Sequence, residues 1–518
     1  MSVSTVTRAA EQSVAASEGE VYQNLIGGRW QPASDGRTLD MISPSDGQVF
    51  AKIARGTRAD VDAAVKAARH AFDEGAWGRL TATERGRLMA RLGEAILAHH
   101  EELSQLEARD CGKPMKQARA DITATARYFE FYGAAADKVH GETIPFLDGY
   151  MVTILREAKG VTGHIIPWNY PAQMFGRSLA PALAMGNAVV MKPAEEACVT
   201  PVRLAQLAQE VGFPPGALNV VTGIGEEAGA ALSAHPGIAF LSFTGSPEVG
   251  TLVQKAAAEN HIGCTLELGG KSPQIVFEDA DFDAAVPVVV NAIVQNGGQT
   301  CSAGSRVLVQ KSIYDKFVTA VTARFKLLRV GSHAMDLDCG PLISANQKKR
   351  VLGFIEQAKK DGVPVLAEAQ LADGTPGNGF YVAPVLFGPV PRDNPLACEE
   401  VFGPAVDHSL RRRGRRHQAG QFDRLRSGCR HLDPRWRTPD AGGEENALRP
   451  GVRERLRRRR GHRAALRRRQ EKRARPREGH GGASRVFAHQ DDHLQARLTF
   501  HPLNLTTKTR RTRRSAKQ

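Results

Sequence analysis

The sequence predicts an α/β protein built from two α/β domains in series. Short apolar runs typical of buried parallel strands recur along the chain, as in GVTGHIIP, NAVVMKP, ALNVVTG and IAFLSFTGS. Segments with helical periodicity, such as TPVRLAQLAQEVG and EVGTLVQKAAAEN, separate these runs. A second series of the same kind starts near residue 271 with SPQIVFE and continues through SRVLVQ. This alternation favours a doubly wound domain followed by a second domain, with a ligand-binding cleft between them.

The net charge of +15 is concentrated at one end of the 518-residue chain. Residues 407–518 contain 33 Lys and Arg, of which 30 are Arg, against 11 Asp and Glu. Residues 1–406 contain 37 basic and 44 acidic residues, so this part carries no excess of positive charge. The last fifth of the chain therefore has a composition of its own.

The cysteines and the N-terminus indicate a protein of a reducing compartment. The seven cysteines form no CxxC pair and no Cys/His cluster, so neither a zinc site nor a disulfide framework is expected. Residues 1–21 lack the apolar region of a signal peptide, and no apolar run reaches membrane-spanning length. We expect a disordered lead-in over 1–21 and a cytoplasmic protein that does not bind membranes.

A single cysteine in NGGQTCSAGSR (296–306) is the strongest local signal for chemistry. Cys301 follows a predicted helix and a Gly-Gly turn, where small neighbours leave room for a substrate carbon. Such a thiol is a nucleophile if its pKa is lowered or a base lies nearby. The alternative is a small buried hydrophobic residue, which is what most free cysteines are.

Glu267 lies in the apolar strand of TLELGGKSP (265–273), directly before a Gly-Gly turn. A carboxylate between two leucines is costly to bury unless it is paired, hydrogen-bonded or protonated. That environment suits a general base working near neutral pH. The alternative is a glutamate on a strand edge that faces solvent.

Asn169 ends the strand GHIIPWNYP (163–171) between two prolines. A side-chain amide held by rigid neighbours can donate a hydrogen bond to a developing oxyanion. Asn beside proline is also an ordinary turn residue, so this signal is weak by itself.

Three further strand ends favour a nucleotide site. In VVMKPAEEA (189–197), Lys192 and Glu195 could hold the hydroxyls of a ribose, or form a surface ion pair. VVTGIGEEAG and FLSFTGSPEVG both run from strand to helix through a glycine turn, which directs backbone N–H groups towards an anion such as a pyrophosphate. Neither contains GxGxxG, so the usual dinucleotide fingerprint is absent.

Together and in this order, PWN, KPAE, FTGS, ELGGKSP, GQxC and EEVFGP resemble the NAD(P)-dependent aldehyde dehydrogenase superfamily over residues 22–406. The resemblance implies a Rossmann-type NAD-binding domain over 22–139 and 159–268. It also implies an oligomerisation hairpin over 140–158 and a catalytic domain over 269–406. The catalytic domain would be truncated at 406. The expected partners are a small-molecule aldehyde and, if the C-terminus were intact, further copies of the chain in a homodimer or homotetramer.

The resemblance also implies a role for each motif residue. Cys301 would attack the aldehyde to give a thiohemiacetal, its backbone N–H and Asn169 would hold the oxyanion, and Glu267 would activate water to hydrolyse the thioester. A carboxylate at Glu195 would accept from a ribose 2′-hydroxyl and repel a 2′-phosphate, which favours NAD over NADP. The cofactor-binding residues implied are Trp168, Lys192, Glu195, Gly225, Gly229, Thr244, Ser246, Glu400 and Phe402.

The resemblance stops after EEVFGPAV, where the arginine-rich segment begins. Read one base out of register, codons compatible with this segment permit NGYGAGGGIELPFGGVK, which is similar to the family's sequence. The segment 407–518 is therefore interpreted as an out-of-frame or disordered basic tail that starts near Val406–Asp407. A true arm binding a polyanion such as a nucleic acid is the less favoured alternative, since such an arm usually mixes Lys with Arg.

Two functions follow from these observations. The first is the oxidation of an aldehyde to a carboxylic acid with NAD+. The second is an inactive remnant of such an enzyme, because the motifs end before the family's C-terminal segment. The identity of the aldehyde is not readable from the motifs.

Overall fold

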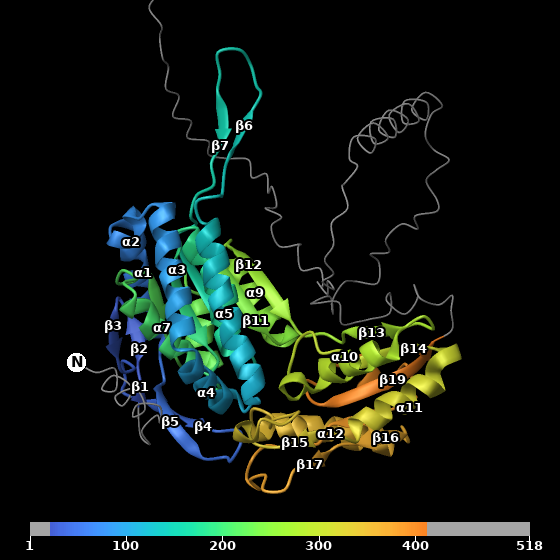
Figure 1. Ribbon diagram of the computed structural model, residues 1–518. Coiled ribbons are helices and arrows are strands. Elements are labelled where there is room, and N and C mark those ends of the chain that lie inside the picture. The colour runs from blue at the N-terminus through green and yellow to red at the C-terminus, as the bar shows by residue number, and fades with distance from the viewer. Residues whose placement is uncertain (1–20, 412–518) are drawn as a thin grey trace, which may run out of the picture. The chain divides into compact units, whose positions relative to one another are not determined.

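The computed structural model describes residues 21–411, and the remainder of the chain is drawn as a grey trace in Figure 1. The predicted lead-in, apart from Val21, and nearly all of the predicted basic tail lie outside the described residues. None of the helices within 21–411 is long and apolar enough to cross a membrane.

A seven-stranded sheet forms the centre of the first half of the chain. Its strand order is β12-β11-β8-β9-β10-β2-β3, in which the first five strands are parallel and the last two are antiparallel. The parallel strands coincide with the apolar runs predicted from the sequence. The strands are β2 (Asn24–Ile26), β3 (Arg29–Gln31), β8 (Val161–Ile166), β9 (Ala188–Pro193), β10 (Leu218–Val220), β11 (Phe240–Gly245) and β12 (Gly263–Leu268).

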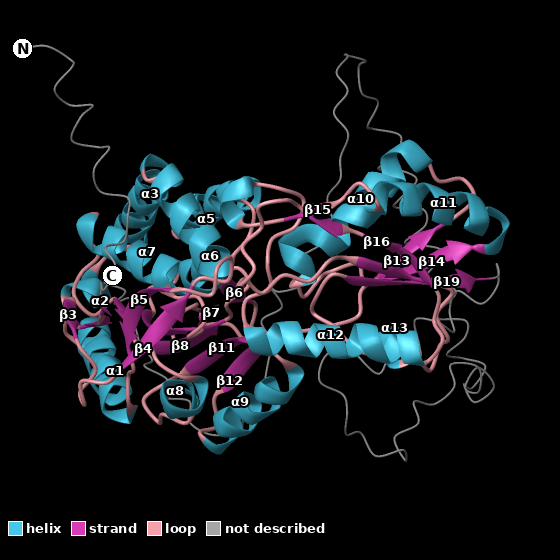
Figure 2. Cartoon of the chain, turned by 90° about the horizontal axis from the view of Figure 1, so that it is seen from below, coloured by secondary structure: helices cyan, strands magenta, loops and turns pink. Residues whose placement is uncertain are grey.

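Helices cover both faces of this sheet, as Figure 2 shows. One face carries α1 (Arg58–Asp73), α8 (Ala230–Ser233) and α9 (Pro247–Glu259), with the short π-helix η1 (Gly225–Gly229) before α8. The other face carries α3 (Ala82–Ala98), α5 (Met115–Ala135), α6 (Pro171–Ala184) and α7 (Val199–Glu210). The short helix α2 (Ala76–Arg79) follows α1, and α4 (His100–Cys111) lies between α3 and α5. The parallel strands are therefore buried on both sides, which explains their nearly continuous apolar sequences.

A five-stranded sheet organises the second half in the order β13-β14-β19-β18-β16. The strands β13 (Pro273–Val276), β14 (Arg306–Gln310), β18 (Val385–Phe387) and β19 (Ala405–Arg411) are parallel, and β16 (Val365–Glu368) is antiparallel. In Figure 2, α10 (Phe282–Val294) and α11 (Tyr314–Phe325) lie on one face, and α12 (Ala345–Lys360) and α13 (Pro395–Cys398) on the other. Three short 3-10 helices connect these elements: η2 (Gln295–Gly298), η3 (Lys311–Ile313) and η4 (His333–Met335).

The strand β19 is the last element along the described chain, yet it lies in the middle of its sheet between β14 and β18. Successive side chains point to opposite faces: Val406 joins the core beneath α10 and α11, and Ala405 joins the core beneath α12. The strand continues to Arg411, five residues beyond the expected end of the catalytic domain at 406. Main-chain pairing to β14 persists there because ladder hydrogen bonds do not depend on the side chains.

Three smaller sheets complete the described structure. A three-stranded sheet joins β1 (Val21–Tyr22), β4 (Thr38–Ile42) and β5 (Val49–Ala54), and a two-stranded sheet joins β15 (Arg329–Val330) and β17 (Gln370–Leu371). The strands β6 (Glu142–Ile144) and β7 (Val152–Ile154) form a hairpin within 140–158 (Figure 1). Its large apolar side chains are exposed: Phe146, Leu147, Tyr150, Met151 and, just after β7, Leu155.

A buried histidine in the seven-stranded sheet makes the fold sensitive to acid. His164 on β8 is 2% exposed, and its ring nitrogens lie 2.8 Å from Ser178 Oγ and 2.9 Å from Thr162 Oγ1. Burial lowers the pKa of His164 to about 3. The imidazole is therefore neutral in the folded protein over the whole physiological range.

We predict that acidification from pH 7 to pH 5 removes about 2 kcal/mol of stability through this histidine. Because the folded pKa is depressed, the stability is present above the unfolded value of about 6.5 and is lost as pH falls towards about 3. Urea unfolding at both pH values should show a smaller acid-induced loss for His164→Gln than for the unmodified chain. The exposed His70→Gln is the control, and equal losses in the two variants would contradict the prediction.

Candidate active site

A cavity of about 400 Å³ lies at the carboxyl ends of β8, β11 and β12. This is the edge at which parallel sheets usually bind ligands. Two loops close the other side of the cavity. One surrounds residue 301 and precedes β14, and the other surrounds residue 400 and follows α12. Eight of the residues predicted from the motifs line it: Trp168, Asn169, Thr244, Ser246, Glu267, Cys301, Glu400 and Phe402.

The loop that carries Cys301 has an unusual backbone. Asn296, Gly297 and Gly298 all have positive φ values, of 51°, 62° and 74°. A Cβ atom on Gly298 would lie 2.3 Å from the carbonyl oxygen of Gly403, so only glycine allows this close approach. The Gly-Gly pair of the motif therefore lets the cysteine loop press against the EEVFGP segment.

Hydrogen bonds connect the cysteine loop to the turn after β8. Asn169 Nδ2 donates to Gln299 O at 2.9 Å, and Asn296 Nδ2 donates to Asn169 O at 2.8 Å. Tyr170 and Thr300 lie one residue further along each segment, and their hydroxyl oxygens are 2.8 Å apart. These contacts fix the Asn169 amide relative to the neighbouring Cys301.

Charged groups surround the Cys301 thiol, which is partly buried. Burial raises the pKa of Cys301 above its ordinary value, and the carboxylates of Glu267 and Glu400 raise it further. The guanidinium of Arg177 and the backbone N–H of Ser302 act in the opposite direction. In the free protein the balance favours the thiol over the thiolate, so the charges around it decide how readily it becomes a nucleophile.

Glu267 lies near the end of β12, the edge strand of the seven-stranded sheet. Its side chain is 32% exposed. It nevertheless lines the cavity and forms an ion pair with Arg177 on α6, with 3.2 Å between Glu267 Oε2 and Arg177 Nη2. The carboxylate is therefore paired rather than facing open solvent.

Glu400 and Phe402 form the opposite wall. Gly270 N donates to Glu400 Oε1 at 3.1 Å, and a Cβ on Gly269 would collide with the same carboxylate. Burial raises the pKa of Glu400 to about 7, although the Gly270 N–H and nearby cations oppose the change. The Phe402 ring packs edge-on against Trp168 with 5.4 Å between ring centroids, and Phe402 has a positive φ of 56°.

Thr244 and Ser246 follow β11 at the same edge of the cavity. Ser246 caps α9, because its hydroxyl accepts from Val249 N at 3.3 Å. The start of α9 therefore lies at the cavity, where Ser246, Pro247 and Glu248 line it.

A second group of predicted residues meets beyond β9. Lys192 Nζ is hydrogen-bonded to Glu195 Oε2, and Gly225 N donates to Glu195 Oε1 at 3.1 Å. Gly225 and Gly229 bound the π-helix η1. Lys192 is only 3% exposed, so the pair is not the surface ion pair considered from the sequence. Burial acts to raise the pKa of Glu195, but the Lys192 charge and hydrogen bonds hold it below its ordinary value.

A buried ammonium group that no sequence motif indicated supports the Asn169 turn. Lys113 Nζ is fully buried and donates to Glu107 Oε1 at 2.9 Å, Asp121 Oδ2 at 2.7 Å and Asn169 O at 3.1 Å. The three hydrogen bonds of this one ammonium group therefore link α4, α5 and the turn after β8. No motif predicts this lysine, because CGKP resembles an ordinary loop between helices and only the tertiary structure brings its partners together.

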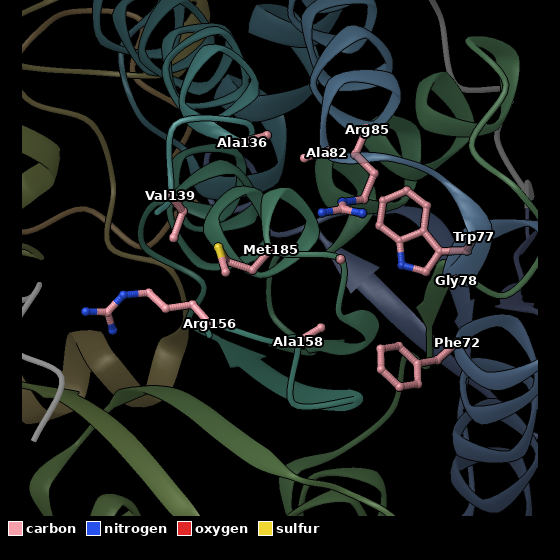
Figure 3. A pocket seen from close by; sticks show the side chains of 11 residues that line it. Phe72, Trp77, Gly78, Ala82, Arg85, Ala136, Val139, Arg156, Ala158 and Met185 are labelled. Carbon is pink, nitrogen blue, oxygen red and sulfur yellow. The ribbon is translucent and has the colours of Figure 1, made fainter. Parts of the chain in front are cut away.

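Another cavity, of about 330 Å³, lies where the β6–β7 hairpin joins the helices (Figure 3). Trp77, Arg85 and Met185 are among its lining residues. Arg85 donates to the carbonyl oxygens of Leu80 and Ala184, which indicates a structural role for its guanidinium. The lining includes no cysteine, no carboxylate and none of the predicted site residues, in contrast to the Cys301 cavity.

The described residues contain no cluster of His, Cys, Asp and Glu suited to a metal ion. An α/β protein with a thiol, a carboxylate and a side-chain amide gathered in one cavity fits the class of enzymes that use a cysteine nucleophile.

Comparison with known proteins agrees with this class. The model of the aldehyde dehydrogenase family matches residues 30–407. Human mitochondrial aldehyde dehydrogenase is 42% identical over 410 residues, which cover 77% of this chain and 78% of the human protein. A crystal structure of a Burkholderia cenocepacia protein assigned as an aldehyde dehydrogenase matches with a TM-score of 0.74 and 57% identity, covering 75% of this chain and 82% of that one. The NAD+ complex of a Bacillus cereus aldehyde dehydrogenase matches with a TM-score of 0.74 and 40% identity, covering 76% and 80%.

The chain belongs to the aldehyde dehydrogenase family. The resemblance and the α/β fold class predicted from the motifs are confirmed, and with them the assignment to the aldehyde dehydrogenase oxidoreductases.

We predict that Lys113→Met destabilises the protein by about 3–5 kcal/mol, because it leaves two buried carboxylates without their cation. Urea unfolding at pH 7 measures this loss. Arg119→Met is the matched control, since Arg119 pairs with Glu101 on the surface and such pairs contribute little. Equal stability of the two variants would show that the buried ammonium is dispensable.

Proposed function

We propose that the chain oxidises an aldehyde to a carboxylic acid with NAD+, using Cys301 as the nucleophile. The observation that carries the proposal is that Cys301, Glu267 and Asn169 line one cavity although they come from three separate motifs. The Cys301 sulfur adds to the aldehyde carbon and forms a thiohemiacetal oxyanion. One N–H of the Asn169 amide is bonded to Gln299 O, and the other is directed to this oxyanion together with the backbone N–H of Cys301.

Bound NAD supplies a hydride acceptor, and the substrate carbon then remains attached to Cys301 as a thioester. Glu267 accepts a proton from water, whose oxygen adds to the thioester carbonyl. The C–S bond breaks, the carboxylic acid leaves, and the cysteine sulfur is regenerated. Arg177 holds Glu267 in place beside this thioester.

The residues beyond β9 fit the adenosine side of NAD. Glu195 is anchored by Gly225 N and Lys192, which places a carboxylate where two ribose hydroxyls could donate to it. A negative charge at this position repels a 2′-phosphate, so we propose NAD rather than NADP. Trp168, Ser246 and the N-terminus of α9 would contact the pyrophosphate, Thr244 would lie near the nicotinamide, and Glu400 with Phe402 would hold the nicotinamide ribose.

We also propose that the β6–β7 hairpin mediates assembly into a homo-oligomer. Its Phe146, Leu147, Tyr150 and Met151 are each more than 60% exposed, and clustered exposed apolar side chains favour a protein–protein contact. A dimer or tetramer in the cytoplasm, acting on a small-molecule aldehyde, remains our proposal for the assembled enzyme.

A shift of reading frame near Val406–Asp407 is our proposed origin of the basic segment. Asp407 is fully buried, and its nearest described cation is Lys271, with 3.3 Å between Nζ and Oδ1. Neither carboxylate oxygen makes a hydrogen bond to a described residue, and burial raises the pKa of Asp407. A carboxylate is a costly residue for the middle of a sheet, and it stands where the motifs end.

Resequencing of codons 395–420 from independent template tests this origin. A base gained or lost there restores a longer family sequence. An unchanged frame would reject it, and the chain would then be a diverged copy whose activity has to be measured directly.

We predict that Cys301→Ala abolishes NADH formation while NAD binding is retained, because the nucleophile is lost but the cofactor contacts remain. Glu267→Gln should complete the first turnover and then stall with substrate bound to Cys301 as a thioester. Stopped-flow absorbance of NADH and mass spectrometry of the intact protein measure the two effects. Steady turnover by Cys301→Ala would overturn the mechanism.

A further inference from the structure

Arg177 is an unusual residue for its position in the fold. It lies in the middle of α6, where most neighbours are buried and apolar, and its side chain is 29% exposed. Helical spacing places it on the partly exposed stripe with Gln173 and Pro181. A residue on such a stripe normally faces solvent, but the guanidinium of Arg177 reaches β12 and pairs with Glu267.

The Arg177–Glu267 pair joins α6 to β12. The 3.2 Å separation is that of an ion pair, and each side chain is about one-third exposed. Partial burial makes the pair stronger than the typical surface ion pair, without the full desolvation penalty of a buried one. It restrains the Glu267 carboxylate at the end of β12.

The charge of the same guanidinium also acts on the pKa of Cys301. Glu267 and Glu400 surround the thiol with negative charge and, with burial, raise the pKa of Cys301. Arg177 is the cationic side chain that acts against them. Removal of Arg177 would weaken the positive charge that opposes these two carboxylates at the thiol.

We propose that Arg177 is a positioning residue of the active site: it holds the Glu267 carboxylate at the cavity wall and supplies the positive charge that makes Cys301 a competent nucleophile. This inference rests on the proposed function, in which Cys301 and Glu267 perform the chemistry. Arg177 acts through both residues without contacting the reacting atoms.

Other titratable groups face the same region and have to be considered in any pH measurement. Tyr128 on α5 is one of these groups. Burial raises the pKa of Tyr128, and the charge of Arg177 opposes this change. Glu400 faces the thiol from the segment before β19. The remaining charged groups that line the cavity are Glu248, Arg350 and Glu399.

The experiment is the pH dependence of Cys301 alkylation by iodoacetamide in the full chain without substrate or cofactor. Mass spectrometry of the Cys301 peptide separates this cysteine from Cys264 and Cys398, which are also accessible. We expect Arg177→Gln to shift the profile to higher pH and to slow alkylation at pH 8 about threefold to tenfold. Arg177→Lys, which keeps the charge, should recover most of the rate. A purely structural arginine would show no such recovery by lysine.

Arg55→Gln is the matched control. Arg55 pairs with Glu227 at 2.8 Å, and the two side chains have nearly the same exposed fractions as the Arg177–Glu267 pair, 30% and 32%. Loss of this pair removes an equivalent ion pair elsewhere, so the alkylation profile should not move. Unfolding curves of all three variants establish that each is folded at the pH values used.

Identical alkylation profiles for Arg177→Gln and the unmodified chain would overturn the proposal. If Arg177→Gln instead raised KM only for aldehydes that carry a carboxylate, with alkylation unchanged, Arg177 would be a substrate anchor and the proposal would also be wrong. An unmodified chain that does not oxidise aldehydes counts against the proposed function alone, because the alkylation measurement requires no turnover.

Discussion

The hydrogen bonds between the turn after β8 and the cysteine loop are the contacts on which the active site depends. Asn169 and Cys301 belong to segments organised by different sheets, and neither sheet alone could set the distance between them. Two hydrogen bonds fix that distance. The Asn169 side chain donates to the backbone carbonyl of Gln299, and the Asn296 side chain donates to the backbone carbonyl of Asn169. The Asn169 amide, which we propose as the oxyanion donor, is thus held in place by the loop that carries Cys301.

The buried ammonium group of Lys113 also supports the turn after β8. Lys113 binds the carbonyl oxygen of Asn169 and draws on the carboxylates of Glu107 and Asp121, so two helices support one turn. Arg177 and Glu267 form a second, partly exposed ion pair. The site is therefore organised by two cations with different surroundings, one fully buried and one partly accessible to solvent. Preorganisation of this kind reduces the rearrangement needed when charge develops on the substrate.

The sequence predicted those parts of the site that lie at strand ends. Apolar runs identified the parallel strands, and the polar residue after each run had to lie at the carboxyl edge of a sheet, as it does for Asn169, Lys192 and Ser246. Arg177 and Lys113 could not be predicted in this way. Their partners are distant in the chain, and helical spacing alone places Arg177 on a partly exposed stripe. The partial exposure of Glu267 likewise depends on β12 being an edge strand, which strand patterns do not specify.

The pairing of β19 could not be predicted either, because strand order is a tertiary property. The position of β19 in its sheet has a consequence for synthesis of the chain. The strands β13, β14, β16 and β18 are synthesised before β19. Until β19 is made, β14 and β18 each have an unpaired edge. Such open edges can pair with other nascent chains, and the interval lasts until residue 411 has left the exit tunnel. Any change to the sequence around residue 406 therefore acts on the strand that joins the two parts of this sheet.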